Sequence, residues 1–268
     1  NKFRGRVLGK VVEESLESDS RLEAEAHDLV PVLCDGDKVA YWVEPAKKIK
    51  NADGRANRNY ISVMNSSVDF IGDIHGHCTE LRLLLAKLGY EESMGAFRYP
   101  GGARSVVFLG DYIDRGSQSR EVIDLVRAMR DAGSAVALMG NHEFNALCFW
   151  QLNGAGGSHV IHCIPGGYLR EHSFNKVAIH AKTVDSYRGR RAEFEDMLLF
   201  LRTLPFFIEE DSFRAQHACF DLGAARALDA AGIRSFADGN FDELIARAND
   251  QFNEYDDSLF DPINYFLK

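Results

Sequence analysis

A unit that occurs three times between residues 68 and 143 constrains the fold of this chain more than any other feature. Each unit begins with a short apolar run that ends in Gly-Asp or Gly-Asn. Short apolar runs with such turn signals are typical of buried strands, and the amphipathic stretches that follow them are typical of helices. Alternating strands and helices predict an α/β fold with a parallel sheet. The three runs are Val68–Ile71, Ser105–Leu109 and Ala135–Met139.

The helices expected after the first two strands are marked by apolar residues at positions i, i+3, i+4 and i+7. That spacing places four side chains on one face of a helix. A third helical stretch is expected from Glu143 onward. The marking residues are Leu81, Leu84, Leu85 and Leu88 in the first helix and Val122, Leu125, Val126 and Met129 in the second.

The later part of the chain adds a helix and a pair of antiparallel strands. Helical spacing recurs through residues 194–201. Residues 206–208 and 213–216 flank a polar turn, which predicts two antiparallel strands, and His217 stands at the end of the second. The glycine-rich residues 153–172 are expected to form a loop near the site entrance.

Residues 1–60 differ from the remainder and are predicted to form a small N-terminal appendage, separate from a catalytic domain at 61–268. The appendage carries an Asp35-Gly36 pair between two apolar runs, which predicts a β-hairpin. The chain ends on Ile263–Lys268, which reads like the interior of a domain, so we expect the domain to be incomplete there. The hairpin runs are 30–33 and 39–43, a charge-rich helix is expected around 13–19, and a polar linker at 47–59.

Composition narrows the setting and the partners. The chain has 268 residues, of which 46% are hydrophobic and 26% charged, and no apolar run approaches the ~20 residues that cross a bilayer. Five cysteines without a CxxC pair argue against a disulfide framework and favour a reducing, cytoplasmic setting. A formal net charge of −9 disfavours nucleic acid and anionic lipid as partners, so a small molecule or a protein is expected instead.

The residues that follow the strands are of the types that bind metal ions. Asp73, His75, Asp111, Asn141 and His217 offer carboxylate, imidazole and amide ligands, which suit Mn, Fe or Zn better than a thiolate site would. Two divalent ions ~3.5–4 Å apart can be held if one carboxylate bridges them. We assign the bridge to Asp111, because it follows the middle of the three strands in sequence. A metal-activated hydroxide could then attack phosphorus.

Three further residues have catalytic chemistry. The planar guanidinium of Arg115 matches the non-bridging oxygens of a phosphate. His142 can protonate the departing oxygen, and Asp114 can hold its other ring nitrogen.

The remaining histidines have no spacing that selects them. We interpret five as structural or surface residues and set aside His27 as part of the appendage. The five are His77, His159, His162, His172 and His180.

Three motifs in this order and spacing resemble the calcineurin-like metallophosphoesterases, most closely the branch of Ser/Thr protein phosphatases and bacterial diadenosine tetraphosphatases. The resemblance covers about Val68 to Lys268 and implies a four-layer α/β/β/α sandwich. It implies one metal on Asp73, His75 and Asp111 and another on Asp111, Asn141 and His217, with His142 as general acid paired with Asp114, and Arg115 on phosphate. Of the metals that suit these ligands we expect Mn first, with Fe or Zn as alternatives. The motifs are Asp73-Ile-His75-Gly, Gly110-Asp111-Tyr-Ile-Asp114-Arg115-Gly and Gly140-Asn141-His142-Glu143.

One departure from the family pattern concerns the second metal. Members of the family usually supply a further histidine downstream, whereas no histidine follows His217 in this chain. We expect that histidine, and a second phosphate-binding arginine, to lie beyond Lys268. Loss of the site is the rival explanation.

The sequence therefore predicts a metal-dependent hydrolase of a phosphomonoester, a phosphoprotein or a dinucleoside polyphosphate. The alternative is a catalytically weak module that binds a metal or a partner while keeping the phosphoesterase fold. The missing histidine supports that alternative, whereas Arg115, Asp114 and His142 oppose it, because they serve catalysis rather than folding. A nuclease is disfavoured by the acidic balance, which the short basic cluster at 188–191 does not reverse.

Overall fold

The structure is a computed structural model. It describes residues 67–151, 167–210, 213–218, 221–249 and 262–267, together with the backbone of three N-terminal strands at 6–7, 30–33 and 40–45. The predicted helix at 13–19, the linker at 47–59 and most of the glycine-rich loop lie outside the described residues.

A parallel sheet forms the first layer of strands. Its order is β1-β4-β7-β8, and each neighbouring pair is parallel. Val68 is opposite Ser105, and Val106 is opposite Ala135, so the three predicted strands are confirmed and adjacent. The strands are β1 (Arg6–Val7), β4 (Ser67–Ile71), β7 (Arg104–Phe108) and β8 (Ala135–Ala137).

A second sheet combines strands from the two ends of the chain. Its order is β2-β3-β10-β9, and all described pairings are antiparallel. Both predicted strand pairs, β2 with β3 and β9 with β10, are confirmed. The strands are β2 (Val30–Leu33), β3 (Ala40–Pro45), β9 (Phe207–Glu209) and β10 (Phe213–Gln216).

The N-terminal strands do not form a sheet of their own. Arg6 of β1 is opposite Asp69 of β4, and β3 pairs with β10 in the second sheet. The edge of an unpaired strand exposes backbone donors and acceptors, and joining an existing sheet satisfies them. Strands from the first 60 residues are therefore part of the same sheets as the strands that lead to the candidate site, and the division into an appendage and a catalytic domain stays a prediction. The boundary at residue 60 lies outside the described residues and stays a prediction.

The two sheets enclose a small apolar core. Phe70 of β4 meets Phe213 of β10 edge to face, with 5.3 Å between ring centroids. Because side chains alternate along a strand, Val106 and Phe108 of β7 belong to the other core, which includes helices, whereas Val107 points between the sheets. The core between the sheets contains Val68, Phe70, Val107, Leu109, Leu138, Ile208, Phe213 and Ala215.

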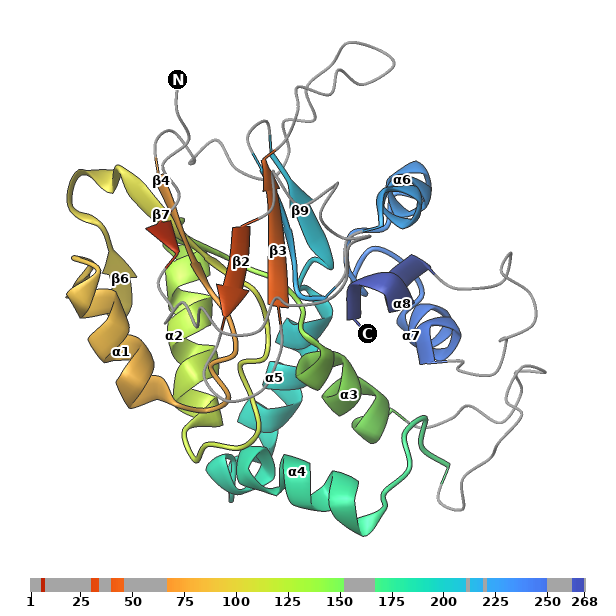
Figure 1. Cartoon of the computed structure of the whole chain (residues 1–268). Helices are drawn as coiled ribbons and strands as arrows, with labels where there is room; N and C mark the ends of the chain where they lie inside the picture. The colour runs from red at the N-terminus through yellow and green to blue at the C-terminus, as the bar shows by residue number, and fades with distance from the viewer. Residues whose placement is uncertain are drawn as a thin grey trace, which may run out of the picture.

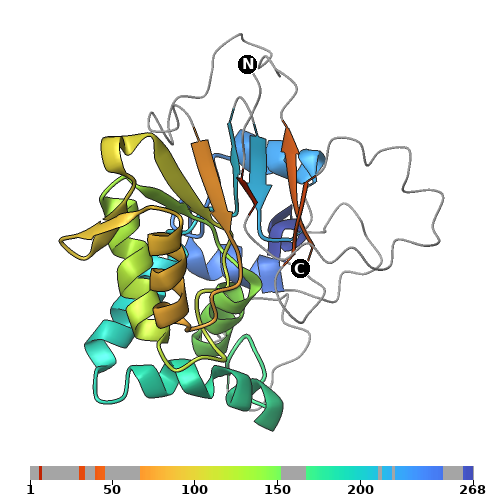
Figure 2. The same cartoon turned by 60° about the vertical axis from the view of Figure 1, so that its left-hand side comes forward.

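Helices lie on both sides of the strands. Figure 1 shows α1 and α2 on one side and α6, α7 and α8 on the other, and Figure 2 shows the same arrangement from a second direction. Leu85 of α1 and Val126 of α2 are fully buried, as the apolar spacing predicts. The helices are α1 (Cys78–Lys87), α2 (Ser119–Asp131), α3 (Asn141–Trp150), α4 (Phe174–Ser186), α5 (Arg191–Arg202), α6 (Leu222–Ala230), α7 (Phe241–Asn249) and α8 (Pro262–Leu267).

The α/β class and the parallel sheet are confirmed, while the complete four-layer arrangement stays a prediction. Phe207 of β9 stacks on Phe266 of α8 at 4.8 Å, which places a helix against one strand of the second sheet. The side chains of β2 and β3 lie outside the described part of the structure. A short hairpin, β5 (Glu91–Ser93) with β6 (Ala96–Arg98), and the turn η2 (Pro100–Gly102) precede β7. None of the described helices is long and apolar enough to cross a membrane.

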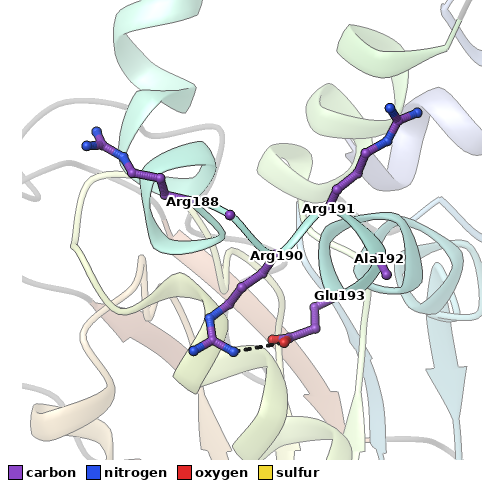
Figure 3. Close-up of a pocket in the computed structure, with 6 residues that line it drawn as sticks. Arg188, Arg190, Arg191, Ala192 and Glu193 are labelled. Carbon is purple, nitrogen blue, oxygen red and sulfur yellow. Dashed lines mark hydrogen bonds and ion pairs between the residues drawn. The ribbon is translucent and has the colours of Figure 1, made fainter.

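A polar hollow lies at the turn between α4 and α5, where the sequence has its short basic cluster (Figure 3). Each of its arginines is paired with an acid nearby: Arg190 with Glu193 at 2.9 Å, Arg191 with Glu195 at 2.7 Å, and Arg188 with Asp185. Such exposed pairs are typical of a solvated surface and contribute little to stability. The hollow shares no residue with the metal-binding groups described next.

Candidate active site

The loops after three adjacent strands meet at one edge of the parallel sheet. Asp73 follows β4, Asp111 follows β7, and Asn141 follows β8 as the first residue of α3. His217 comes from the second sheet, directly after β10. Helix α3 begins two residues before the predicted Glu143, so Asn141 and His142 both lie in its first turn. The carboxyl edge of an open α/β sheet is where ligand sites form, and all four predicted positions reach it.

Asp111 stands between two imidazole rings. Its Oδ2 lies 3.7 Å from Nε2 of His75, and its Oδ1 lies 3.5 Å from Nε2 of His217. Nε2 of His75 is also 3.9 Å from Oδ2 of Asp73. The two oxygens of one carboxylate thus face different imidazoles, the arrangement that a bridging ligand between two cations requires.

The main chain fixes the orientation of both imidazoles. Nδ1 of His75 lies 3.0 Å from the carbonyl of Ile113, and Nδ1 of His217 lies 2.8 Å from the carbonyl of Leu109. A carbonyl only accepts, so in both rings the proton is on Nδ1 and Nε2 presents a lone pair. A backbone carbonyl behind the ring is a usual partner for a metal-binding histidine.

Several buried polar atoms of the cluster have no hydrogen-bond partner. They are Oδ1 of Asp73, Nε2 of His75 and Oδ1 of Asn141. A buried polar atom without a partner costs roughly 1–3 kcal/mol, so such atoms are expected only where another ligand satisfies them. All three are acceptors, and acceptors without donors are what a divalent cation can satisfy, so the donor set of this site fits divalent cations.

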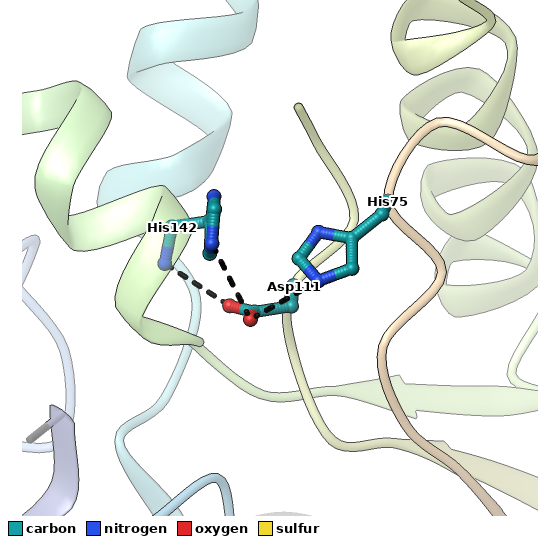
Figure 4. Close-up of side chains that lie close together, drawn as sticks. All are labelled: His75, Asp111 and His142. Carbon is teal, nitrogen blue, oxygen red and sulfur yellow. Dashed lines mark hydrogen bonds and ion pairs between the residues drawn. The ribbon is translucent and has the colours of Figure 1, made fainter. Parts of the chain in front are cut away.

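Two groups of side chains lie close enough to hold an ion. One group is His75, Asp111 and His142, and the other is Asp73, Asp111 and His217. Within each group the ligand atoms lie within 4.8 Å of one another. Figure 4 shows His75 and His142 on opposite sides of the Asp111 carboxylate. The proximity of His142 makes it a rival ligand as well as a candidate acid, which metal analysis of a His142 variant can decide.

The pKa shifts of Asp73 and His75 are those expected of a metal site without its cations. Burial raises the pKa of Asp73, and the neighbouring carboxylate of Asp111 raises it further. Burial lowers the pKa of His75 and so favours its neutral form, the one that binds metals. A cation placed between the two carboxylates would reverse the shift of Asp73, because positive charge stabilises the ionised form.

His142 and Asp114 form the predicted pair, with Nδ1 of His142 2.7 Å from Oδ2 of Asp114. Burial alone would raise the pKa of Asp114, but the bonds from His142 and His180 outweigh it and hold that pKa well below its usual range. Burial likewise would lower the pKa of His142, and the bond to Asp114 outweighs it, so the pKa of His142 is raised. The pair therefore favours a charged imidazolium that can give up a proton.

The backbone of the motifs is strained. Asp111 has φ 57° and Asp114 has φ 71°, in the left-handed region that residues other than glycine rarely adopt. Outliers of this kind cost ~1–3 kcal/mol each and persist where the surroundings over-determine them, commonly at functional sites. Among the described non-glycine residues, only Met94 has a positive φ outside the motifs. The strained motif residues are Asp73, His75, Asp111, Asp114 and Arg115.

Two motif glycines are required by close packing. A Cβ on Gly110 would collide with the backbone of Gly140, and one on Gly140 would collide with Asp111. Gly110 also has φ 104°, which favours glycine. The second and third motifs therefore touch through their backbones, which brings their ligands together.

Glu143 has a structural part in the site that its sequence pattern does not predict. Its side chain is fully buried and accepts hydrogen bonds from the backbone N–H groups of Asp111 at 2.8 Å, Tyr112 at 2.8 Å and Gly140 at 3.0 Å. Burial and the nearby Asp111 raise its pKa to about 8. One carboxylate thus ties the second motif to the third. Its position inside a motif was the only signal available.

Arg115 is exposed at the edge of the cluster, and its positive charge lowers the pKa of nearby Asp73.

The histidines interpreted as structural or surface residues differ from one another in the structure. His77 is exposed and lies near Glu80, whereas His180 is buried and bonds to Asp114. His172 is exposed and bonds to the carbonyl of Phe149. His27, His159 and His162 lie outside the described residues.

Comparison with known proteins identifies relatives of the region that forms this site. A model of the calcineurin-like phosphoesterase family matches residues 66–222, more than half of the chain. The asymmetrical bis(5'-nucleosyl)-tetraphosphatase PrpE of Halalkalibacterium halodurans is 47% identical over 74 residues, 28% of this chain and 30% of that protein. The protein of the same name from Oceanobacillus iheyensis is 37% identical over 101 residues, 38% of this chain and 40% of that protein. The chain thus spans less than half the length of these curated relatives.

Solved structures resemble the chain more weakly. A protein serine/threonine phosphatase from Saccharomyces cerevisiae is 19% identical with a TM-score of 0.34, over 55% of this chain and 35% of that one. A cold-active protein-tyrosine phosphatase of a Shewanella species is 22% identical with a TM-score of 0.31, over 68% of this chain and 56% of that one.

Proposed function

The chain belongs to the calcineurin-like phosphoesterase family, and from that premise we propose that it is a metal-dependent phosphoester hydrolase. The observation that carries the proposal is the Asp111 carboxylate, whose two oxygens face the Nε2 atoms of His75 and His217. Partnerless buried atoms on Asp73, His75 and Asn141 add to it. Such an arrangement has a use when cations are bound and is costly when they are not.

We assign two divalent cations to the cluster. Asp73, His75 and Asp111 would hold one, and Asp111, Asn141 and His217 the other. The oxygen and nitrogen donors suit Mn best, with Fe or Zn as alternatives. When bound, such ions polarise a phosphoryl oxygen and lower the pKa of a water nucleophile.

The chain's own residues bind the phosphate and move one proton. Arg115 and Asn141 are assigned to the non-bridging phosphate oxygens, because the guanidinium fork of Arg115 matches them in charge and shape and the amide of Asn141 can donate to them. As water oxygen bonds to phosphorus and the ester P–O bond breaks, Nε2 of His142 gives its proton to the departing oxygen. Asp114 stays ionised, holds Nδ1 of His142 and stabilises the charge that the imidazolium carries before transfer.

The substrate class we favour is a phosphorylated small molecule, and a dinucleoside polyphosphate first, because the curated relatives are named as tetraphosphatases of that kind. A phosphomonoester and a phosphoprotein are the other members of the class that this site can accommodate. The formal charge of −9 disfavours nucleic acid and a membrane surface as partners. The five cysteines, none of them in a CxxC pair, favour a reducing, cytoplasmic setting.

The proposal is tested by assaying the purified protein with Mn against p-nitrophenyl phosphate, diadenosine tetraphosphate and a phosphopeptide. We expect turnover of at least one substrate, its loss on chelation, and its loss in Asp111→Asn. Asp124→Asn, an exposed change on α2, is the matched control and should behave as wild type. Stoichiometric metal binding without turnover of any substrate would support the binding-module alternative instead.

A further inference from the structure

Helix α4 is attached to the site by polar side chains. All of α4 is described, and its only buried residues are His180 and Thr183, whereas apolar Phe174, Val177 and Val184 are exposed. A surface helix usually buries its apolar residues, so this helix has the reverse pattern. Both buried side chains contact one residue, Asp114 of the second motif.

Those contacts occupy one oxygen of the Asp114 carboxylate. Oδ1 lies 2.8 Å from Nδ1 of His180 and accepts a hydrogen bond from Oγ1 of Thr183 at 2.7 Å. The Thr183 hydroxyl also accepts from the backbone N–H of Asp114 at 2.8 Å. With Oδ1 engaged in this way, Oδ2 is the oxygen that faces His142.

Trp150 determines the tautomer of the neutral His180 ring. Nε1 of Trp150 donates to Nε2 of His180 at 2.9 Å. An indole N–H can only donate, so Nε2 of His180 is the acceptor and the ring proton is on Nδ1. His180 therefore donates to Asp114, which leaves that carboxylate ionised.

These hydrogen bonds form one continuous chain that connects the two ends of α3. His142 stands in the first turn of that helix and Trp150 is its last residue. Trp150 is bonded to His180, His180 to Asp114, and Asp114 to His142. Trp150 is itself held by ring contacts, including one to Phe194 of α5 at 5.1 Å.

We propose that His180 is a positioning residue for phosphoester hydrolysis, and that the N–H of Trp150 sets the tautomer in which His180 aligns Asp114 with His142. The inference rests on the proposed function, because it acts through proton donation by His142. Apolar packing alone would not need two hydrogen-bonded polar side chains at the only buried positions of α4. Buried polar groups left without their partners are costly, so the full set is kept together.

The tautomer is tested by long-range proton–nitrogen NMR spectra of histidine-labelled protein. We expect wild-type His180 to be protonated on Nδ1 and unprotonated on Nε2. Trp150→Phe keeps an aromatic ring but removes the N–H, and should give a mixture of His180 forms. Phe194→Leu is the matched control, since it alters the packing of Trp150 and leaves the N–H in place. A wild-type ring protonated on Nε2, or an unchanged His180 in Trp150→Phe, contradicts the proposal.

The positioning role is tested by kinetics on an alkyl phosphate, whose leaving group needs a proton, and on p-nitrophenyl phosphate, which needs it less. His180→Phe should lower kcat on the alkyl phosphate by about 10- to 100-fold, the usual range for a residue that orients a site from behind. Trp150→Phe should lower it by about fivefold, as expected for one hydrogen bond. For both variants the fall in kcat should be smaller on p-nitrophenyl phosphate. His180→Asn, which retains an N–H donor, should have most of the wild-type activity.

A double variant separates failure of this inference from failure of the proposed function. In a His142→Asn background, adding His180→Phe should have no further effect, because both changes remove the same proton donation. A further loss of the same size in both backgrounds would show that His180 acts elsewhere and overturn the inference alone. If His142→Asn lowers kcat by the same factor on the alkyl phosphate and on p-nitrophenyl phosphate, the general-acid assignment and the inference built on it are both wrong.

Discussion

His142 is the residue whose role most needs separating from metal binding. Its ring lies close enough to His75 and Asp111 to be a ligand, and it is also bonded to Asp114 as a general acid would be. We expect His142→Asn to keep its metal content and to lower kcat by about 100- to 10,000-fold, the range for a lost general acid. Metal analysis of the purified variant is the measurement. Loss of metal from a folded His142→Asn protein would reassign His142 as a ligand.

The pH dependence of the reaction belongs to the same pair of residues. The acid form of His142 is present below its pKa and is lost as the pH rises through it, and the bond to Asp114 raises that pKa. Asp114→Asn removes this effect, so the basic limb of the kcat–pH profile for an alkyl phosphate should move to lower pH. His142→Asn, which has no imidazole, should lack that limb. An unmoved limb in Asp114→Asn would mean that another group controls it.

For single residues, the sequence predicts which side chains form the candidate site better than it predicts their contacts with distant parts of the chain. Asp73, Asp111 and Asn141 could be predicted because each follows a strand, and parallel neighbours deliver such residues to one edge. His180 could not, because its contact with Asp114 joins residues 66 positions apart through the docking of α4. Nothing in the spacing around His180 reveals that contact.

At the scale of elements, Glu143 joins the loop after β7 to the start of α3. It accepts backbone hydrogen bonds from Asp111, Tyr112 and Gly140. In Glu143→Gln one acceptor oxygen becomes an amide that faces an N–H group, so the free energy of unfolding should fall by about 1–3 kcal/mol. Denaturant unfolding of the metal-free protein measures this without interference from bound ions.

The control for that change is Glu193→Gln, which alters a half-exposed ion pair with Arg190. Exposed pairs contribute roughly 0–1 kcal/mol, so the control should be close to wild type. Equal stability of Glu143→Gln and wild type would remove Glu143 from its proposed structural role.

The order of helices and strands along the chain could be predicted from the sequence, whereas the pairing of strands could be predicted only in part. Helix spacing in α1 and α2 and the strand runs before the motifs predicted those elements, because local burial sets their periods. The pairing of β3 with β10 joins segments from opposite ends of the chain, and no local pattern specifies it. The two-residue strand β1 is too short to carry a pattern at all.

At the scale of the whole molecule, a strand from the first 60 residues pairs with the strand that leads to the candidate site. They carry no predicted metal ligand, yet β3 pairs with β10, and β10 leads directly to His217. Deleting residues 1–60 exposes that edge, so we expect a lower Tm with Mn binding retained in the folded fraction. Thermal unfolding with and without Mn measures both. An unchanged Tm would make the pairing dispensable, and a folded protein without Mn binding would contradict the ligand assignment.

The central claim, that Asp111 bridges two cations, is tested most directly by counting metal ions per chain by elemental analysis after loading with Mn. We expect two ions in the wild type, about one in Asp73→Asn, and none retained in Asp111→Asn, because Asp111 belongs to both candidate metal-binding groups and its two oxygens face His75 and His217. Circular dichroism of each variant confirms that it is folded. Two ions retained in a folded Asp111→Asn protein, or fewer than two in the wild type, would contradict the claim.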